Sequence, residues 1–569
     1  MGQRLSGLDS AVLASESSRI PLHSLALWIL DPSTIPGGYS FERLRDGILN
    51  GIDLLPRLHC RLSEVPYGLA PPSWVEARVD AGLHFERIVV PRPGGPRQLA
   101  RLVAERNQQL LDRSRPLWHV SILEGLASGS IGALVKLLPV PADGTWAADL
   151  AGRLGSGSPE TPPPLPAGPA RNPGGAEGRL ERLAEALPDI AAQPLRLARA
   201  AAHAARAFVE SSVDGDPGAS PVENPVAHPA LNRRSSARRA VAHTSLRMAT
   251  VGELAERAET GWREVVLAAL AGALRSELER SEGIPPDPLI ACVIDTAQAA
   301  AVRLDSTRTH LPAISRRRLY TELPQPAARL SQIAAASHET RAGHHLTWPG
   351  ALAEVVDAAP PLMLRWLTAA AADLLPRTNA APPFHVLVSF LEGPGKRTFI
   401  AGARLEHVYP LHPIIDGVNL HVAACRSGAA VDVGIQACRR FMPDVWPLAA
   451  TLPGLSAPRG ARGERIDACR HAEWVKSAAW QTTPRFSPGA STTSPTRPEI
   501  RRRRTPSTRG SSTCRSCTPR TTSRQMAGSA TSSSTWATAT TSPSSPSRTW
   551  ARSPSTRPRS RSAQGFPSG

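Results

Sequence analysis

The first 153 residues alternate between two hydrophobic patterns, one typical of strands and one of helices. Strand-like segments carry apolar residues in a run or at every second position, as Leu83–Val90 does. Helix-like segments carry them three or four positions apart, as Phe41–Ile52 does. This pattern predicts strands at Ser24–Leu30, Leu83–Val90, Trp118–Leu126 and Ile131–Leu138, and helices at Phe41–Ile52, Leu99–Leu111 and Ala147–Leu154. We expect residues 1–153 to form a mixed α/β domain.

Residues 230–455 carry the same two patterns, so we expect a second α/β unit there. Its clearest helix is Trp262–Glu279, with an apolar face that includes Val265, Val266 and Leu270. The pattern predicts further helices at Pro326–Ala342 and Pro361–Leu374, and strands at Arg238–Met248, Pro288–Ile294, Phe384–Leu391, Thr398–Tyr409, Val418–Cys425 and Ala430–Ile435. Strands and helices in both units indicate an α/β sandwich of two halves.

The two units are joined by residues 154–229, which read as a linker with one long helix. Residues 154–178 are rich in Gly and Pro, which add chain entropy and remove backbone donors. A helix rich in Ala, Arg and Leu is predicted over Gly178–Phe208, followed by a polar loop to about residue 229.

The last segment, residues 456–569, differs in kind from the rest. From Arg459 onward there are 20 Lys and Arg against 4 Asp and Glu, which is 16 of the net charge of +18. After Ile500 there is no Asp, Glu or Lys, and Arg, Ser, Thr and Pro dominate. Such a composition cannot bury enough apolar surface to offset chain entropy, so we predict a disordered tail. A shifted reading frame of GC-rich DNA would give the same composition, and both origins stay open.

Composition and cysteines narrow the classes of function. The folded part is nearly neutral, so the high total charge does not indicate a nucleic-acid-binding fold. The seven cysteines are scattered, which favours a reducing compartment. Cys514 and Cys517 have no second pair at zinc spacing, so we expect no metal site. Neither an 18-residue apolar run nor an N-terminal apolar signal region is present, so we expect a cytoplasmic location.

Several short segments carry recognisable motifs. They are Leu5-Ser6-Gly7-Leu8-Asp9, Pro21-Leu22-His23, Leu111-Asp112-Arg113-Ser114-Arg115-Pro116-Leu117-Trp118, Val265–Ala269, Ser389 with Gly393-Pro394, Gly402-Ala403 with Tyr409-Pro410, and Asp416-Gly417. In order and spacing, over residues 1–455, this set resembles the bacterial wax ester synthase/diacylglycerol acyltransferase family.

The resemblance implies a CoA-dependent acyltransferase fold, similar to chloramphenicol acetyltransferase, in which two α/β halves enclose a channel. It implies transfer of a fatty acyl group from acyl-CoA to diacylglycerol or a long-chain alcohol, with acyl-CoA as substrate and no cofactor. Oily substrates further imply association with the inner membrane face or lipid droplets at the periphery. By their motif positions we expect channel residues at Pro116, Leu117, Trp118, Ser389, Gly393 and Pro394.

The catalytic motif of that family, H-H-x-x-x-D-G, is altered in this chain. A histidine with a pKa near the working pH can take the proton of an attacking alcohol, and the second His of the motif has this role in the family. The matching segment keeps Asp143 and Gly144 as structural residues, but Leu138 and Pro139 occupy the two His positions. Neither side chain can carry a proton. His119, which follows Pro-Leu-Trp, is a weak substitute base if it points inward.

Two further departures lie in polar motifs. The family has an N-D pair where this chain has Arg263-Glu264, and its S-N-x-P-G-P motif reads here with Phe390 and Glu392. The scaffold signals are therefore kept while the polar positions change. Three hypotheses remain: an active O-acyltransferase, a non-catalytic pseudoenzyme homologue that binds acyl-CoA or a lipid surface, and a protein that binds anionic partners through its Arg-rich tail. We expect no specific nucleic-acid partner.

Overall fold

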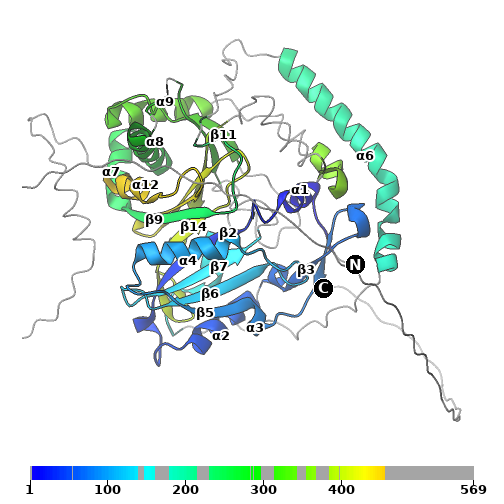
Figure 1. Ribbon diagram of the computed structural model, residues 1–569, viewed down its shortest axis with the longest axis horizontal. Helices are drawn as coiled ribbons and strands as arrows, with labels where there is room; N and C mark the ends of the chain where they lie inside the picture. The colour runs from blue at the N-terminus through cyan, green and yellow to red at the C-terminus, as the bar shows by residue number, and fades with distance from the viewer. Residues whose placement is uncertain are drawn as a thin grey trace, which may run out of the picture. The chain divides into compact units, whose positions relative to one another are not determined.

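The computed structural model describes residues 3–53, 55–138, 146–160, 179–213, 228, 230–281, 283–285, 287–295, 313–341, 354–364, 366, 384–395 and 397–454. All of them belong to one compact unit, residues 1–482, drawn in Figure 1. The predicted tail, most of the predicted Pro361–Leu374 helix, and Pro139, Asp143 and Gly144 of the motif segment lie outside the described residues.

A seven-stranded sheet is built mainly from the N-terminal residues. Its strands in spatial order are β5 (Phe85–Val89), β6 (Trp118–Glu124), β7 (Ile131–Leu137), β2 (Ser24–Asp31), β14 (Ala403–Leu411), β13 (Phe399–Ile400) and β8 (Gly155–Ser156). All neighbouring pairs are antiparallel except β5 and β6. A small sheet of β1 (Gln3–Arg4), β4 (Ser73–Glu76) and β3 (Cys60–Ser63) accompanies it.

A six-stranded sheet forms the C-terminal half. Its order is β11 (Ala313–Arg318), β10 (Ile290–Asp295), β12 (Val386–Glu392), β15 (Leu420–Ser427), β16 (Ala430–Cys438) and β9 (Arg239–Arg247). The central pairs β10–β12 and β12–β15 are parallel, which buries both faces of β12.

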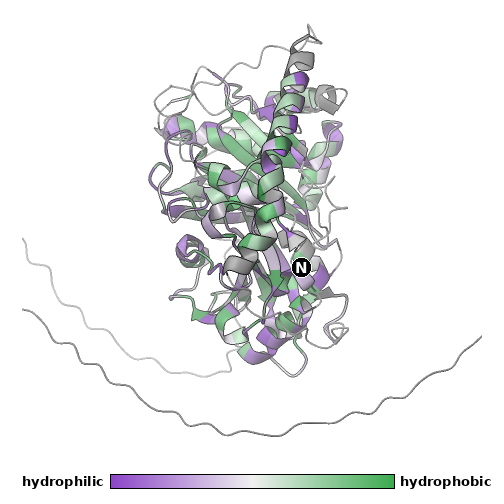
Figure 2. Cartoon of the chain, turned by 90° about the vertical axis from the view of Figure 1, so that its right-hand side faces the viewer, coloured by the Kyte–Doolittle hydropathy of each residue, from purple (hydrophilic) through white to green (hydrophobic). Residues whose placement is uncertain are grey.

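Helices cover both sheets and one helix lies between them. The C-terminal sheet packs one face against α7 (Met248–Arg257), α8 (Trp262–Ser281), α9 (Pro326–Arg341) and α12 (Trp446–Thr451), seen together in Figure 1. The N-terminal sheet packs one face against α2 (Phe41–Ile52) and α5 (Trp146–Leu154). Between the sheets, α4 (Pro96–Gln108) shares a core cluster with β2, β9 and β14. Figure 2 shows the strands largely in the green of hydrophobic residues.

Local sequence explains where the well-predicted helices begin. In α2, the Ser40 hydroxyl accepts the backbone N–H of Arg43 at 3.2 Å, which caps the helix, while Leu44, Ile48 and Ile52 are buried along one face. The helix α8 is buried on nearly all sides, as its apolar composition requires. The long α6 (Arg179–Val213) carries both hydrophobic and hydrophilic residues along its length, as Figure 2 shows. No helix among the described residues is long and apolar enough to cross a membrane.

Most predicted elements are confirmed, and several short ones were missed. The predicted strand at Ser24–Leu30 and the predicted helices at Phe41–Ile52 and Trp262–Glu279 match β2, α2 and α8. The predicted strand Thr398–Tyr409 is two strands, β13 and β14, because a turn at Ala401 and Gly402 interrupts it. The elements that we missed are α1 (Gly7–Ser15), α3 (Ala81–His84), α7, α12, β1, β3, β4, β8 and β11.

The strand β14 crosses from the C-terminal residues into the N-terminal sheet. It pairs with β2 over Arg404–Leu411 and also lies against β15 and β16. At the closest point, a Cβ on Gly434 would lie 1.9 Å from the Pro410 carbonyl oxygen, so only glycine allows this approach. Residues 230–455 therefore do not fold entirely within their own sheet, because β14 is a strand of the N-terminal sheet that packs against β15 and β16.

Candidate functional site

Leu138, which the sequence analysis placed at the first His position of the family motif, lies directly after β7 in an apolar cluster. Its side chain is 3% exposed, and its backbone N–H donates to the Leu117 carbonyl at 3.1 Å. The cluster contains Leu5, Leu13, Ile20, Leu22, Leu62, Trp74, Leu117 and Leu138. Leucine therefore fits this position as a core residue, where a histidine would bury a polar ring among aliphatic side chains.

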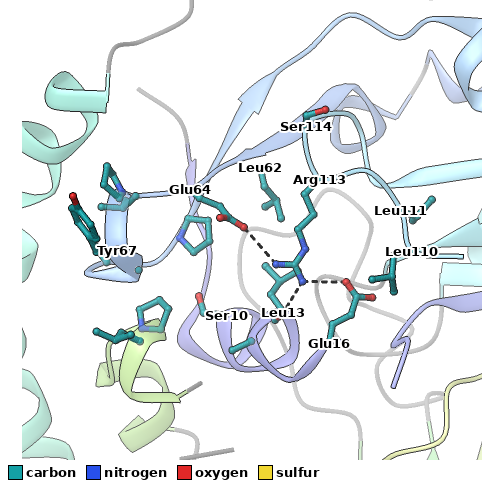
Figure 3. Close-up of a pocket in the computed structure, with 18 residues that line it drawn as sticks. Ser10, Leu13, Glu16, Leu62, Glu64, Tyr67, Leu110, Leu111, Arg113 and Ser114 are labelled. Atoms are coloured by element: carbon teal, nitrogen blue, oxygen red, sulfur yellow. Dashed lines mark hydrogen bonds and ion pairs between the residues drawn. The ribbon is translucent and has the colours of Figure 1, made fainter. Parts of the chain in front are cut away.

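A cavity of about 1110 Å³ lies beside that cluster and shares Leu13 and Leu62 with it. Figure 3 shows that its walls come from α1, the loop after β3 and the Leu110–Ser114 segment. The helical turn at residues 361–364 contributes Pro361 and Leu362. The lining combines aliphatic side chains with the polar groups of Glu16, Glu64 and Arg113, and the volume is large enough for a long hydrocarbon chain.

The polar side of this cavity is a charge network centred on Arg113. Its guanidinium donates to Glu16 at 3.1 Å, to the Leu13 carbonyl at 2.8 Å and to Glu64 at 3.4 Å, as the dashed lines in Figure 3 show. The Glu16 side chain is only 3% exposed, and Arg113 supplies a cationic partner for this buried carboxylate.

His23, from the Pro-Leu-His motif, lies behind the cavity wall rather than in it. Its Nε2 atom is 3.2 Å from the Glu16 carboxylate and 3.3 Å from the backbone N–H of Leu111. Burial, and then the charges of Lys136 and Arg113, lower its pKa far below the ordinary value, so the ring is neutral. Its contacts connect α1, β2 and the loop after α4, which is a structural role.

The residues Pro116, Leu117 and Trp118 are buried and serve packing. Trp118 donates from Nε1 to the Leu58 carbonyl at 2.8 Å and stacks on His84, with ring centroids 4.2 Å apart. Leu117 belongs to the same cluster as Leu138. We expected these residues to line a channel. None of the three lines this cavity, which is bordered by Leu111, Arg113 and Ser114 of the same motif and by the preceding Leu110.

His119, the substitute base considered from the sequence, faces α4 instead of the cavity. It alternates on β6 with Trp118 and Val120, which pack against α2 and α5, so its ring lies on the opposite face. Its Nδ1 atom is 4.0 Å from Glu86, and burial is the main cause that lowers its pKa. His119 is not among the residues that line the cavity.

Ser389, a predicted channel residue, forms a hydrogen-bonded pair that the sequence did not reveal. Its hydroxyl lies 2.8 Å from Nε2 of His421 on the neighbouring strand β15, and Nδ1 of His421 lies 2.7 Å from the Pro413 carbonyl. Ser389 is 1% and His421 is 5% exposed. His412 lies beside them, with its ring centroid 5.4 Å from that of His421.

Comparison with known proteins identifies the family to which the chain is related. A family model for the wax ester synthase/diacylglycerol acyltransferase catalytic domain matches residues 5–266, and the C-terminal domain model of the same family matches residues 316–453. The chain therefore carries both domains of the wax ester synthase/diacylglycerol acyltransferase family. This confirms the resemblance inferred from the motifs.

Curated relatives and solved structures agree with that assignment. The candidate diacylglycerol O-acyltransferase Rv1760 of Mycobacterium tuberculosis is 28% identical over 79% of this chain and 89% of its own length. A second one, Rv3740c, is 29% identical over 78% of this chain and 96% of its length. The wax ester synthase/diacylglycerol acyltransferase from Marinobacter aquaeolei VT8 has a TM-score of 0.57 at 23% identity, covering 79% of this chain and 97% of that one. This last match confirms the predicted two-part acyltransferase fold.

Arg263 and Glu392, which the sequence analysis read as departures from polar motifs of the family, contact each other. Arg263 donates to Glu392 at 2.8 Å, and Arg426 donates to the other oxygen of Glu392 at 2.7 Å. Arg263 also lies 3.2 Å from Asp295. The predicted channel residues Gly393 and Pro394 directly follow the end of β12, a central strand of the C-terminal sheet. A Cβ on Gly393 would lie 2.8 Å from the Cys425 sulfur, which explains the glycine by packing.

A further polar cluster joins β14 to the C-terminal sheet and was missed by the sequence analysis. Asp432 is fully buried, and its carboxylate accepts from His407 at 2.9 Å, the backbone N–H of Val408 at 2.8 Å and Ser245 at 2.6 Å. Burial lowers the pKa of His407, but the hydrogen bond and charge of Asp432 outweigh it, so the pKa is raised. The cluster fixes β14 across the two sheets.

No group of three or more His, Cys, Asp or Glu is arranged to hold a metal within the part of the chain that the structure describes. Within those described residues, neither His407 nor His421 belongs to a group of three such side chains.

Proposed function

We propose that this chain is an acyl-CoA-dependent O-acyltransferase of neutral-lipid synthesis whose motif-based proton transfer is impaired. The donor is a long-chain acyl-CoA, and the acceptor is diacylglycerol or a long-chain alcohol. The observation that supports it best is the aliphatic cavity of about 1110 Å³, bordered by residues of the L-D-x-x-x-P-L-W motif. Both domains of a family that acts on such substrates support the reaction class.

Impairment follows from the chemistry of the replaced histidines. An acceptor hydroxyl needs a base, and the first motif position holds a leucine buried among aliphatic side chains. The second position, Pro139, has no proton-accepting side chain whatever its conformation. General-base catalysis typically contributes about 10²–10⁴-fold, and this is the loss expected for transfer by the family mechanism.

Association with a lipid surface is part of the proposal. The rim of the cavity exposes large apolar side chains: Tyr67 is 79%, Leu362 is 52% and Leu110 is 46% exposed. Aromatic and aliphatic residues at the mouth of a hydrocarbon-sized cavity are suited to contact a membrane or lipid-droplet interface, from which water-insoluble acceptors are taken.

The test is release of free CoA from palmitoyl-CoA, with diacylglycerol or hexadecanol as acceptor. The native chain is compared with a variant carrying Leu138→His and Pro139→His. Acceptor-dependent release that rises at least about 100-fold in the repaired variant would support the proposal. Equal, zero release from both chains, with proper folding checked by circular dichroism, would contradict it.

A second candidate function is binding without turnover, as a non-catalytic homologue that holds acyl-CoA or attaches to lipid. The burial of Leu138 favours this candidate, since its side chain packs in the apolar cluster and offers no group for proton transfer. Equilibrium binding of a fluorescent acyl-CoA to the native chain, together with no CoA release from either chain, would favour this candidate over the enzyme.

A further inference from the structure

The long helix α6 turns one side toward the protein and the other side toward solvent. On the inner side, Ala186 and Ala200 are 2% and 8% exposed, and Gln193 donates from Nε2 to the Leu69 carbonyl at 3.3 Å. On the outer side, two leucines, Leu187 and Leu195, are 57% and 56% exposed. Figure 2 looks onto this helix and shows hydrophobic as well as hydrophilic segments toward the viewer.

The two leucines belong to a continuous apolar stripe. Residues three or four positions apart share one side of a helix, and this spacing aligns the exposed residues Ala184, Leu187, Ala191, Leu195, Ala198 and Ala202. A helix that is fully covered within one protein has its apolar side inward and polar residues on the opposite side. Because α6 is apolar on both sides, its outer stripe is suited to a further apolar partner.

Positive charge accompanies this stripe. From Ile190 to Phe208 the sequence contains three Arg, one His and no Asp or Glu. The side chains of Arg196, Arg199 and Arg206 are exposed, and His203 is paired with Glu354 at 2.6 Å. Arg199 and Arg206, seven residues apart, follow the stripe along one flank. An apolar stripe with arginines beside it is the pattern of a helix that lies in the plane of a lipid surface.

The stripe adjoins the exposed apolar rim of the cavity. The helix α6 lies against the turn Pro66–Gly68, which carries Tyr67 at 79% exposed. Leu362, also on the rim, is 52% exposed, and Trp366, four residues later, is 68% exposed. Of the ten large apolar side chains exposed among the described residues, three line the cavity, two lie on α6 and one is Trp366. Single exposed apolar residues are ordinary, but such a concentration marks an interaction surface.

We propose that the outer side of α6 and the apolar rim form a docking surface for a phospholipid layer that carries negative charge. The stripe and the rim side chains enter the apolar boundary of the layer, and Arg199 and Arg206 lie at the level of the lipid phosphates. The inference rests on the proposed function for its purpose, since docking holds the mouth of the cavity at the surface that supplies a water-insoluble acceptor. It adds the element that docks and the charge of the lipid.

The chemistry of this surface favours a lipid layer over a protein partner. The stripe consists mostly of alanine over about 27 Å, and alanine offers none of the large anchors on which protein interfaces depend. A lipid layer needs only a continuous apolar strip beside positive charge. Tyr67 and Trp366 are aromatic residues with a polar group, the type that is enriched at the boundary between membrane and water.

The experiment uses the full chain and vesicles of phosphatidylcholine, with or without about 30% phosphatidylglycerol. A trace of phosphatidylcholine with a photoactivatable acyl chain is included, and the cross-linked peptides are mapped by mass spectrometry. Mapping is needed because the Arg-rich tail is itself a candidate for binding anionic lipid, and it separates the tail from α6. We expect adducts on α6 when phosphatidylglycerol is present, and fewer of them in about 0.5 M NaCl.

The charge of α6 is tested with the double variant Arg199→Gln, Arg206→Gln. Each arginine near an anionic surface contributes about fivefold to binding, so cross-linking of α6 should fall about 20-fold. The matched control is Arg101→Gln, Arg257→Gln, which removes the same charge from exposed positions on α4 and α7. The control should retain the adducts on α6.

The apolar stripe is tested with the double variant Leu187→Asn, Leu195→Asn. Both side chains are exposed, so the fold should be unaffected, while cross-linking of α6 should fall about tenfold or more. The matched control is Leu83→Asn, Val89→Asn, at side chains that are 47% and 68% exposed on α3 and β5. It should retain the adducts on α6.

Several results would overturn the inference. Adducts confined to the tail, or adducts on α6 that persist in both test variants, would show that this surface does not dock on lipid. Cross-links between the α6 helices of two chains without vesicles would assign the stripe to a second copy instead. CoA release by the repaired Leu138→His, Pro139→His chain without adducts on α6 would overturn this inference and keep the proposed function. Adducts on α6 without CoA release from either chain would support docking and contradict the proposed function.

Discussion

The ion pair between Arg263 and Glu392 gives a quantitative test of how these two side chains stabilise the C-terminal half. The two groups are 2.8 Å apart, and their side chains are 22% and 30% exposed. Exposed ion pairs typically contribute about 0.2–1 kcal/mol. This pair lies at the upper end because it is partly buried and because Asp295 and Arg426 extend it into a network. We expect a coupling free energy of about 1 kcal/mol between Arg263→Ala and Glu392→Ala.

The assay is a double-mutant cycle from urea unfolding of the native chain, the two single variants and the double variant. The matched control is the pair Arg97 and Asp444, which is 3.2 Å apart with side chains 57% and 48% exposed. Its coupling should be about 0.3 kcal/mol. In about 1 M NaCl both couplings should fall, since screening then acts within about 3 Å. A coupling free energy between Arg263 and Glu392 that is no larger than that of the control pair would refute the expected effect of burial and of the network.

Three further predictions follow from single contacts. Replacing His407 with Gln removes the imidazolium beside Asp432. Because folding raises the pKa of His407, its contribution to the stability of the fold is complete below the ordinary value of 6.5 and is lost as the pH rises through the raised pKa. The substitution should therefore lower the melting temperature more at pH 6 than at pH 9. Trp118→Phe should cost about 1–2 kcal/mol in urea unfolding, since the buried Leu58 carbonyl loses its donor. Ala14→Phe, which fills part of the cavity, should weaken binding of a fluorescent palmitoyl probe about tenfold, and unchanged affinity would place that ligand elsewhere.

Elements with a strong local pattern could be predicted from the sequence almost to the residue. The Phe41–Ile52 helix has a capping serine and apolar residues three or four positions apart, and both signals are local. The path of β14, in contrast, could not be predicted from local signals. Its pairing with β2 joins residues more than 370 positions apart, and nothing in its own alternation distinguishes one sheet from the other. Short elements such as β11 have too few residues to establish a period.

The candidate site, too, could be predicted from the sequence only in part. The motif segments located Leu138 and Ser389 from the sequence, because family motifs are contiguous. Contiguous motifs could not reveal the partner of Ser389, because its contact to His421 depends on the register of β12 against β15. Asp432 and His407 likewise meet through strands of different sheets. Buried polar residues at inward positions of strands, read against the hydrophobic alternation, were the signal available for both.

Three residues that the sequence analysis read as departures from the family pattern fit their surroundings in this chain. A charged side chain without a partner would cost several kcal/mol when buried. Arg263 and Glu392, 129 positions apart, instead lie 2.8 Å from each other. Leu138 completes an aliphatic cluster rather than leaving a gap in it. Leu138, Arg263 and Glu392 are therefore each compatible with a well-packed fold, and their contacts alone would explain why these residues stand at these positions.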